Sequence, residues 1–197
     1  MLALLNLTDH TSKAGLPPPV IIGFYMDPDP GISNQSETTF DKSVQITDTF
    51  LNDSKVDFQS YELRKMPGGK PYLWMSDHSI GVSISHTHQF YLIGLNQVGE
   101  IGVDVERSDR KVHPKLGNRI KNTSDRFIND ISTLQIWTIK EAVLKLTGSG
   151  LRTNMNIVAV HQKSDTLFDV FHENYAISVV SFEQFGCWTS VAWTTNN

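Results

Sequence analysis

The chain has 197 residues, of which 39% are hydrophobic, and its formal net charge is -4 at pH 7. This length suits one large domain or two small similar halves around a hydrophobic core, and the composition excludes disorder as the default state. The negative charge excludes a global attraction to nucleic acid or to an anionic membrane. The single cysteine, Cys187, excludes an internal disulfide framework and a cysteine-rich zinc site.

The N-terminal region favours a cytoplasmic protein. No apolar run reaches the roughly 18 residues needed to cross a bilayer. The apolar start of the chain lacks a positively charged segment and soon meets Asp9, so a signal peptide is not expected. Residues 1–19 end in three prolines, Pro17 to Pro19, and are expected to form an arm.

The first half is predicted to mix strands with one helix, followed by a loop rich in glycine and proline. The predicted elements are a strand over 20–27, a helix over 37–51, a strand over 58–63, a loop over 66–71 and a strand over 82–86.

The second half is predicted to continue with a hairpin, a helix and further strands. Residues 90–95 and 101–106 are expected to pair as a hairpin. A helix carrying residues 137–145 is expected to start after Asn129 or Asp130 and to end before Gly148. The further strands are expected over 156–160, 167–171, 175–182 and 188–193.

The strand over 101–106 alternates between apolar and polar residues. Side chains on a strand change face at every residue, so Asp104 and Glu106 share one face, about 6.6 Å apart along the backbone. One hard cation is within reach of both carboxylates at this separation. Gly102, on the same face, leaves room for a neighbouring element.

The helix places Glu141 and Lys145 together, almost opposite an apolar stripe. Apolar residues such as Trp137 also surround the charged pair, which favours burial and therefore polar partners. The alternative is a plain ion pair one turn apart on a solvent face, with Asp104 and Glu106 as a polar strand face.

Asp104, Glu106 and Glu141 form an oxygen-only set, which suits Mg²⁺ or Mn²⁺ and disfavours zinc. Magnesium binds substrate phosphates as well as carboxylates, so Lys145, with Lys140 beside it, indicates phosphoryl chemistry on a polyphosphate substrate.

Ser85 and His86 end a predicted strand, and two roles stay open for them. They would contact a phosphate, or His86 would be a structural histidine. A metal site from His86 and His88 lacks a third ligand nearby in the sequence. No P-loop and no Gly-x-Ser-x-Gly motif occurs, which removes the usual support for a kinase or a hydrolase.

An internal similarity indicates two related halves. Residues 22–27 align with residues 101–106, so Asp27 takes the place of Glu106 and Tyr25 that of Asp104. We therefore expect an N-terminal half over 20–98 and a C-terminal half over 99–197 that carries the metal site, with a ligand in the cleft between them.

Four motifs, taken in order and at these separations, resemble the 4′-phosphopantetheinyl transferase superfamily, specifically its Sfp-like, two-repeat monomeric branch. They are Gly69-Lys70-Pro71, Ser83-Ile84-Ser85-His86, residues 101–106 and residues 137–145. The resemblance implies an α+β pseudo-dimer that binds coenzyme A and Mg²⁺ between its halves. Its activity would be the transfer of phosphopantetheine to a serine of an acyl or peptidyl carrier protein, as in a holo-carrier protein synthase.

The resemblance also implies roles for individual residues. Asp104, Glu106 and Glu141 would hold Mg²⁺ against the diphosphate, Lys145 would contact a phosphate, and Glu141, directly or through water, would be the candidate base. The cofactor-binding residues expected from the motifs are Gly69, Lys70, Pro71, Ser85, His86, Lys140 and Lys145.

Two regions depart from the family pattern. Between Asp27 and Val56 only Lys42 and Lys55 are basic, where the family brings cations to the 3′-phosphate of coenzyme A; Arg64, Lys65 and Lys70 are candidate substitutes. The aromatic-rich segment before the helix is replaced by residues 119–125.

Carrier proteins are acidic, so the basic run from Arg107 to Arg126 is the expected docking surface, although such runs are commonly just solvated. Two other functions stay open: a degenerate module that binds coenzyme A or a carrier protein without chemistry, and another Mg²⁺-dependent enzyme acting on nucleotides.

Overall fold

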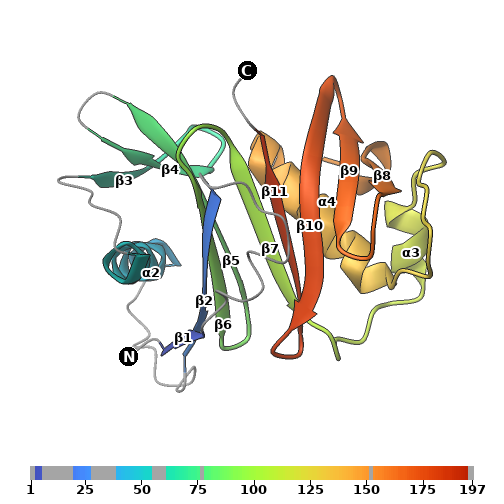
Figure 1. The fold of residues 1–197 in the computed structure, drawn as a ribbon, viewed down its shortest axis with the longest axis horizontal. Coiled ribbons are helices and arrows are strands. Elements are labelled where there is room, and N and C mark those ends of the chain that lie inside the picture. The colour runs from blue at the N-terminus through green and yellow to red at the C-terminus, as the bar shows by residue number, and fades with distance from the viewer. Residues whose placement is uncertain are drawn as a thin grey trace.

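The computed structural model describes residues 3–5, 20–27, 39–54, 61–75, 78–150 and 153–194. They form two antiparallel sheets with helices on the outer faces, a mixed α+β architecture (Figure 1). The α+β fold with two similar halves, expected from the sequence, is therefore confirmed. Among the described residues no helix is both long and apolar enough to cross a bilayer.

The first sheet has six strands in the order β1-β2-β6-β5-β4-β3, and helix α2 covers its outer face (Figure 1). Its elements in chain order are β1 (Ala3–Leu5), β2 (Val20–Met26), α2 (Thr39–Ser54), β3 (Glu62–Lys65), β4 (Pro71–Trp74), β5 (Ser79–Thr87) and β6 (Phe90–Asn96). Strand β1 pairs with β2, so part of the predicted arm joins the sheet. The proline spacer lies outside the described residues.

The second sheet has five strands in the order β7-β11-β10-β9-β8, and helix α4 packs on it. Its elements are β7 (Ile101–Arg107), α3 (Lys115–Ile120), α4 (Thr133–Thr147), the 3₁₀ turn η2 (Met155–Ile157), β8 (Ala159–Gln162), β9 (Leu167–His172), β10 (Tyr175–Gln184) and β11 (Cys187–Trp193). The strand expected over 156–160 is thus partly the turn η2.

The two sheets repeat one topology. In each half a first strand is followed by a helical segment and four strands, and the last strand inserts beside the first, giving β2-β6-β5-β4-β3 and β7-β11-β10-β9-β8. The sequence similarity between residues 22–27 and 101–106 therefore falls on the corresponding strands β2 and β7. A hydrophobic cluster between the sheets joins residues such as Phe24 from one sheet to Val103 from the other.

The predicted hairpin between residues 90–95 and 101–106 is wrong, because β6 and β7 belong to different sheets. Strand β6 pairs with β2 along one edge and with β5 along the other, so neither edge is open to β7. Strand β7 pairs with β11 instead. Asn96 holds the connection from β6 to β7 in place. Its Nδ2 donates to the carbonyls of Glu100 at 3.0 Å and Thr194 at 2.9 Å.

Helix α4 starts later than the sequence indicated. Its N-cap is Ser132, whose Oγ accepts a hydrogen bond from the backbone N–H of Gln135 at 3.1 Å, and neither Asn129 nor Asp130 caps it. Gly148 follows the last turn with φ 74°, as the sequence predicted. The stripe that includes Ile139, Val143 and Leu146 packs in the core against the second sheet.

Gly102 sets the distance between β7 and α4. A Cβ at this position would lie 1.9 Å from the carbonyl oxygen of Ala142 and 2.5 Å from the backbone nitrogen of Leu146. The corresponding Gly23 in β2 leaves room for a side chain instead, because a Cβ there would lie 2.6 Å from the ring of Phe50 in α2. Of these two glycines, only Gly102 therefore faces helix backbone.

We predict that Gly102→Ala lowers the free energy of unfolding by on the order of 3 kcal/mol, because the clash is with helix backbone that cannot rotate away. Chemical denaturation followed by circular dichroism measures the change. Gly117→Ala in α3 is the matched control, since its Cβ would meet only side-chain atoms at 3.6 Å and beyond. Equal stability of the two variants would contradict this account of Gly102.

Candidate active site

The close approach of α4 to β7 brings charged residues from both elements together. Lys145 Nζ lies 2.6 Å from Asp104 Oδ1 and 3.9 Å from Glu141 Oε2. The side chain of Asp104 is only 4% exposed and that of Glu141 12% exposed. Glu141 and Lys145 therefore form a largely buried cluster with Asp104 of the strand. They are not a plain ion pair on a solvent face.

Glu106 lies on the same strand face but has different partners. Its Oε2 accepts from the Thr87 hydroxyl at 3.2 Å, and its Oε1 pairs with the guanidinium of Arg110. Arg110 also lies over the ring of Trp137, with 5.9 Å from Cζ to the ring centroid. Glu106 is thus held between β5 of the first half and the segment that follows β7.

Serine hydroxyls of β5 connect the two halves at this site. Ser83 Oγ accepts from the Val103 N–H at 3.0 Å, and Ser85 Oγ accepts from the Val105 N–H at 3.3 Å. Strand β7 lies at the edge of its sheet, so these hydroxyls satisfy backbone groups that no strand pairs. Ser85 also donates to Asp104 Oδ1 at 2.8 Å and accepts from Lys145 Nζ at 2.8 Å.

The pKa values of Glu141 and Glu106 are both raised. Burial, followed by the charge of Asp104, raises the pKa of Glu141 to about 8, although the Lys145 ammonium opposes the shift. Burial also raises the pKa of Glu106, against the effect of Arg110. At pH 7 Glu141 is therefore largely protonated, while Lys145 pairs with Asp104 and Arg110 pairs with Glu106.

A cavity of about 380 Å³ opens onto these residues. Both halves line it, and most of the predicted site residues are among the lining: Gly69, Pro71, Ser85, His86, Asp104, Glu106, Glu141 and Lys145. Larger cavities lie elsewhere, for example one of about 770 Å³ beside Lys70 and Trp193, but the acids do not line them. The cavity at the acids is therefore the candidate site.

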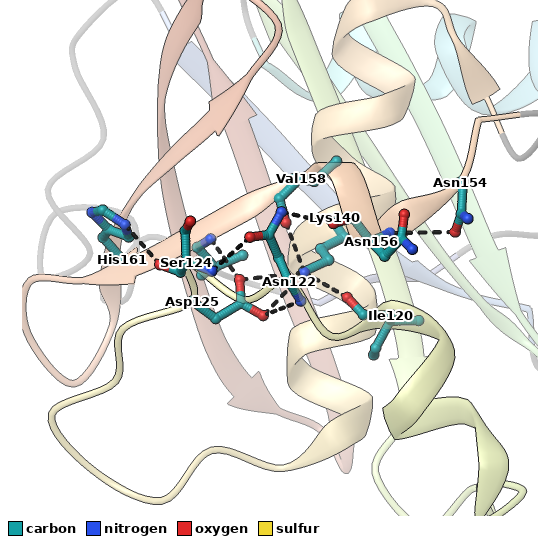
Figure 2. Close-up of polar contacts among 10 residues, drawn as sticks. Ile120, Asn122, Ser124, Asp125, Lys140, Asn154, Asn156, Val158 and His161 are labelled. Atoms are coloured by element: carbon teal, nitrogen blue, oxygen red, sulfur yellow. Dashed lines mark hydrogen bonds and ion pairs between the residues drawn. The ribbon is translucent and has the colours of Figure 1, made fainter.

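Two predicted ligand-binding lysines do not line this cavity. Lys70 turns to the other side of its loop, where its ammonium pairs with Glu100 and with the carbonyl of Leu146. Lys140 is fully buried, and its Nζ donates to the carbonyls of Ile120 at 2.6 Å and Val158 at 2.7 Å (Figure 2). Neither ammonium is placed to contact a phosphate in the cavity.

The Lys140 ammonium is instead the centre of a structural network. The Asp125 carboxylate lies 3.3 Å from it and also accepts from the backbone N–H of Asn122 at 2.9 Å (Figure 2). The backbone N–H of Val160 donates to the same carboxylate at 2.9 Å. Burial lowers the pKa of Lys140, and Asp125 opposes that effect. This pair ties α4 to the segment after α3 and to β8.

The donor set at the acids fits a divalent cation, although the acids are not arranged as a chelate. In the ranges that the structure describes, no group of three or more His, Cys, Asp or Glu residues is positioned to hold a metal ion. Instead, Lys145 forms an ion pair with Asp104, and Arg110 forms one with Glu106. However, Asp104 Oδ2 is buried with no hydrogen-bond partner in the described part, and the set is oxygen-only, so a hard cation suits it.

Sequence comparison finds similar proteins for the half that contributes the acids. Residues 100–195 match the 4′-phosphopantetheinyl transferase superfamily. A Synechocystis sp. protein named "Putative 4′-phosphopantetheinyl transferase" is 30% identical over 151 residues, which cover 66% of this chain. The chain spans 61% of the length of that relative. The matched region includes Asp104, Glu106, Glu141 and Lys145.

Sequence reasoning missed the partners of the acids. Thr87 continues the alternation of Ser83 and Ser85 along β5, so the sequence pattern places its hydroxyl on the same strand face as theirs. Arg110 lies within the basic run expected to dock a carrier protein, and its pairing with Glu106 depends on the path of the chain after β7. The spacing of Asp125 and Lys140 in the sequence does not indicate that they pair, because a loop separates them.

We predict that Glu141→Gln stabilises the protein above pH 8. Between the pKa of Glu141 in the unfolded chain and its pKa of about 8 in the folded protein, the folded state holds a proton that the unfolded state has lost. The free energy of unfolding of the wild type therefore falls as pH rises through this range. Without added metal, the gain over wild type is expected to be on the order of a few kcal/mol at pH 9 and to vanish near pH 4. Thermal unfolding at a series of pH values measures this gain in stability. A gain that does not depend on pH would contradict the raised pKa of Glu141.

We predict that Lys140→Met lowers the free energy of unfolding by about 3–5 kcal/mol, because Asp125 and two carbonyls lose a buried partner. Urea denaturation measures the loss. Lys163→Met is the matched control: its ion pair with Asp169, at 3.1 Å, is largely exposed, and its loss is expected to cost less than about 1 kcal/mol. Similar losses in both variants would refute the structural role of Lys140.

Proposed function

We propose that the protein transfers the 4′-phosphopantetheine group of coenzyme A to a serine hydroxyl of an acyl or peptidyl carrier protein. One observation carries this proposal: the acids and Lys145, from the half that matches the transferase superfamily, face Gly69, Pro71, Ser85 and His86 across one cavity. The motifs of the first half and the second half converge there, although the chain separates them.

Mg²⁺ is the proposed metal, and Mn²⁺ is an alternative with the same oxygen preference. Asp104, Glu106 and Glu141 would hold it, with the unpartnered Asp104 Oδ2 as one ligand atom. The bound ion would neutralise charge on the diphosphate and lower the pKa of the carboxylates around it. Lys145 would then release Asp104 and donate to a phosphate oxygen, since its side chain is 30% exposed and reaches the cavity.

The proposed reaction is one displacement at phosphorus. The serine oxygen of the carrier forms a bond to the phosphorus that bears the pantetheine arm, and the phosphoanhydride bond breaks to release adenosine 3′,5′-bisphosphate. The serine proton passes to Glu141, directly or through water, and Lys145 stabilises charge that develops on the oxygens. Ser85 would position both Lys145 and Asp104, to which it is already hydrogen-bonded.

Other parts of the proposal follow the resemblance. Residues 20–98 and 99–197 would be the two halves of a monomeric, cytoplasmic enzyme of the Sfp-like branch, with the metal ligands in the second. The basic run from Arg107 to Arg126 would dock an acidic carrier protein. Its exposed cations include Lys111, Lys115 and Arg119, whereas Arg110 pairs with Glu106 within the site.

The decisive experiment is a transfer assay. Purified protein, Mg²⁺, coenzyme A and each of a panel of apo carrier proteins are expected to give a carrier heavier by one phosphopantetheine in mass spectrometry. A chelator should stop transfer, and Mg²⁺ should restore it. Saturable binding of coenzyme A without any mass shift would favour the binding module, and nucleotide hydrolysis without a carrier would favour a different Mg²⁺ enzyme.

We predict that Glu141→Gln and Asp104→Asn each reduce the transfer rate by at least about 100-fold, because general base or metal ligand is lost. Initial rates at saturating coenzyme A measure the effect. Glu183→Gln is the control, since this carboxylate is exposed on β10 and does not line the cavity. A rate near wild type in both site variants would remove the acids from the mechanism.

A further inference from the structure

Glu106 has a partner on each of its carboxylate oxygens, and the two partners differ in charge. The Thr87 hydroxyl donates to Oε2 at 3.2 Å, and the Arg110 guanidinium pairs with Oε1. A neutral hydroxyl orients the carboxylate and leaves its negative charge available, whereas a guanidinium neutralises that charge. Arg110 therefore competes for the charge that Glu106 would offer to a divalent cation.

The two cations at the acids are placed differently. Lys145 lines the cavity and contacts Ser85 as well as Asp104, so it fits the phosphate role already proposed for it. Arg110 does not line the cavity and belongs to the segment that follows β7. Its side chain is 46% exposed, and that of Glu106 is 17% exposed. The guanidinium can thus leave Glu106 toward solvent without entering the cavity.

Trp137 gives Arg110 a second partner that does not involve Glu106. The Cζ atom of Arg110 lies 5.9 Å from the centroid of the Trp137 ring, within the range of a cation–π contact. Trp137 belongs to α4 and packs against the hydrophobic core, which holds its ring in place. A guanidinium released from Glu106 would therefore stay near the site with its charge exposed.

The surface around Arg110 suits a negatively charged partner. Lys111 and Lys115 follow it in the chain, and both are exposed. The neighbouring carboxylate of Asp109 is paired with Arg107, whose Nε donates to it at 2.9 Å. An acidic protein that approaches this surface would meet Arg110 beside two other cations, and would compete with Glu106 for the guanidinium.

We propose that Arg110 couples the metal site to the docking of an acidic carrier protein. In the absence of metal Arg110 pairs with Glu106, and when Glu106 binds a divalent cation, Arg110 pairs with a carboxylate of the carrier instead. This inference rests on the proposed function, which supplies both the metal and the acidic partner. Because linkage is reciprocal, carrier and metal each raise the affinity for the other by the same factor.

The first measurement is Mn²⁺ binding by electron paramagnetic resonance, without coenzyme A and without a carrier. Arg110→Gln is expected to bind Mn²⁺ about threefold to fivefold more tightly than wild type, the range that a half-exposed ion pair allows. Arg110→Lys keeps the charge and should stay close to wild type. Lys111→Gln is the matched control, because it removes a neighbouring exposed cation that does not line the cavity.

The second measurement repeats the Mn²⁺ titration with each of a panel of apo acyl and peptidyl carrier proteins. Coenzyme A is again left out, so that no transfer takes place. At least one carrier is expected to raise the Mn²⁺ affinity of wild type by about threefold or more. The effect of the carrier should be lost in Arg110→Gln and kept in Lys111→Gln.

Three results would each overturn the coupling. The first is an Mn²⁺ affinity of Arg110→Gln that is no higher than that of wild type. The second is an equal gain in Lys111→Gln, which would indicate a general effect of surface charge. The third is a panel of carriers that changes the Mn²⁺ affinity of wild type no more than that of Arg110→Gln.

These results are distinguishable from a failure of the proposed function. If wild type modifies a carrier but Arg110→Gln shows no gain in Mn²⁺ affinity, the function stands and the inference falls. If the coupling through Arg110 is present but no carrier gains phosphopantetheine in the transfer assay, the function falls and the coupling stands. If wild type binds no Mn²⁺, both are refuted.

Discussion

Helix α4 packs so closely on β7 that only a glycine fits between them at position 102, and the candidate site depends on this contact. The gap brings Lys145 within 2.6 Å of Asp104, which is almost completely buried. A buried carboxylate without a partner is strongly unfavourable, so the ammonium is needed for the fold as it stands. Burial in this contact, followed by the charge of Asp104, raises the pKa of Glu141 to about 8, so this carboxyl is largely protonated at pH 7.

The site also depends on the meeting of two sheets. Strand β7 has a free edge, and the hydroxyls of Ser83 and Ser85 in β5 satisfy its backbone N–H groups. Because Ser85 contacts Asp104 and Lys145 as well, the interface between the halves and the charged cluster share one hydrogen-bond network. The halves therefore meet where the cavity is, and neither half lines it alone.

The two halves use the same scaffold for different chemistry. Gly102 lets the backbone of α4 approach β7, and the corresponding Gly23 leaves room for the Phe50 side chain of α2. In the second half this contact joins Asp104 to Lys145, whereas in the first half Tyr25, at the matching position, bonds to Asp53 at 3.2 Å. Burial, together with Asp53, shifts the pKa of Tyr25 upward, so the phenol stays neutral and offers no second metal ligand.

The sequence by itself determined how side chains are arranged within single strands and helices. Alternation put Asp104 and Glu106 on one strand face, helical spacing joined Glu141 to Lys145, and the repeat around Gly23 and Gly102 indicated two related α+β halves. These features depend on residues near each other in the chain, where backbone geometry fixes the relation between side chains.

Only the tertiary structure decided which side chains share the cavity. Lys140 neighbours Glu141 in sequence, yet 100° of helix rotation turns it into the core against Asp125. Lys65 and Arg64 are adjacent on one strand, yet only Lys65 faces the cavity. Strand β7 pairs with β11 and not with β6, because β2 and β5 occupy both edges of β6, and the pairing with β2 joins segments far apart in the chain.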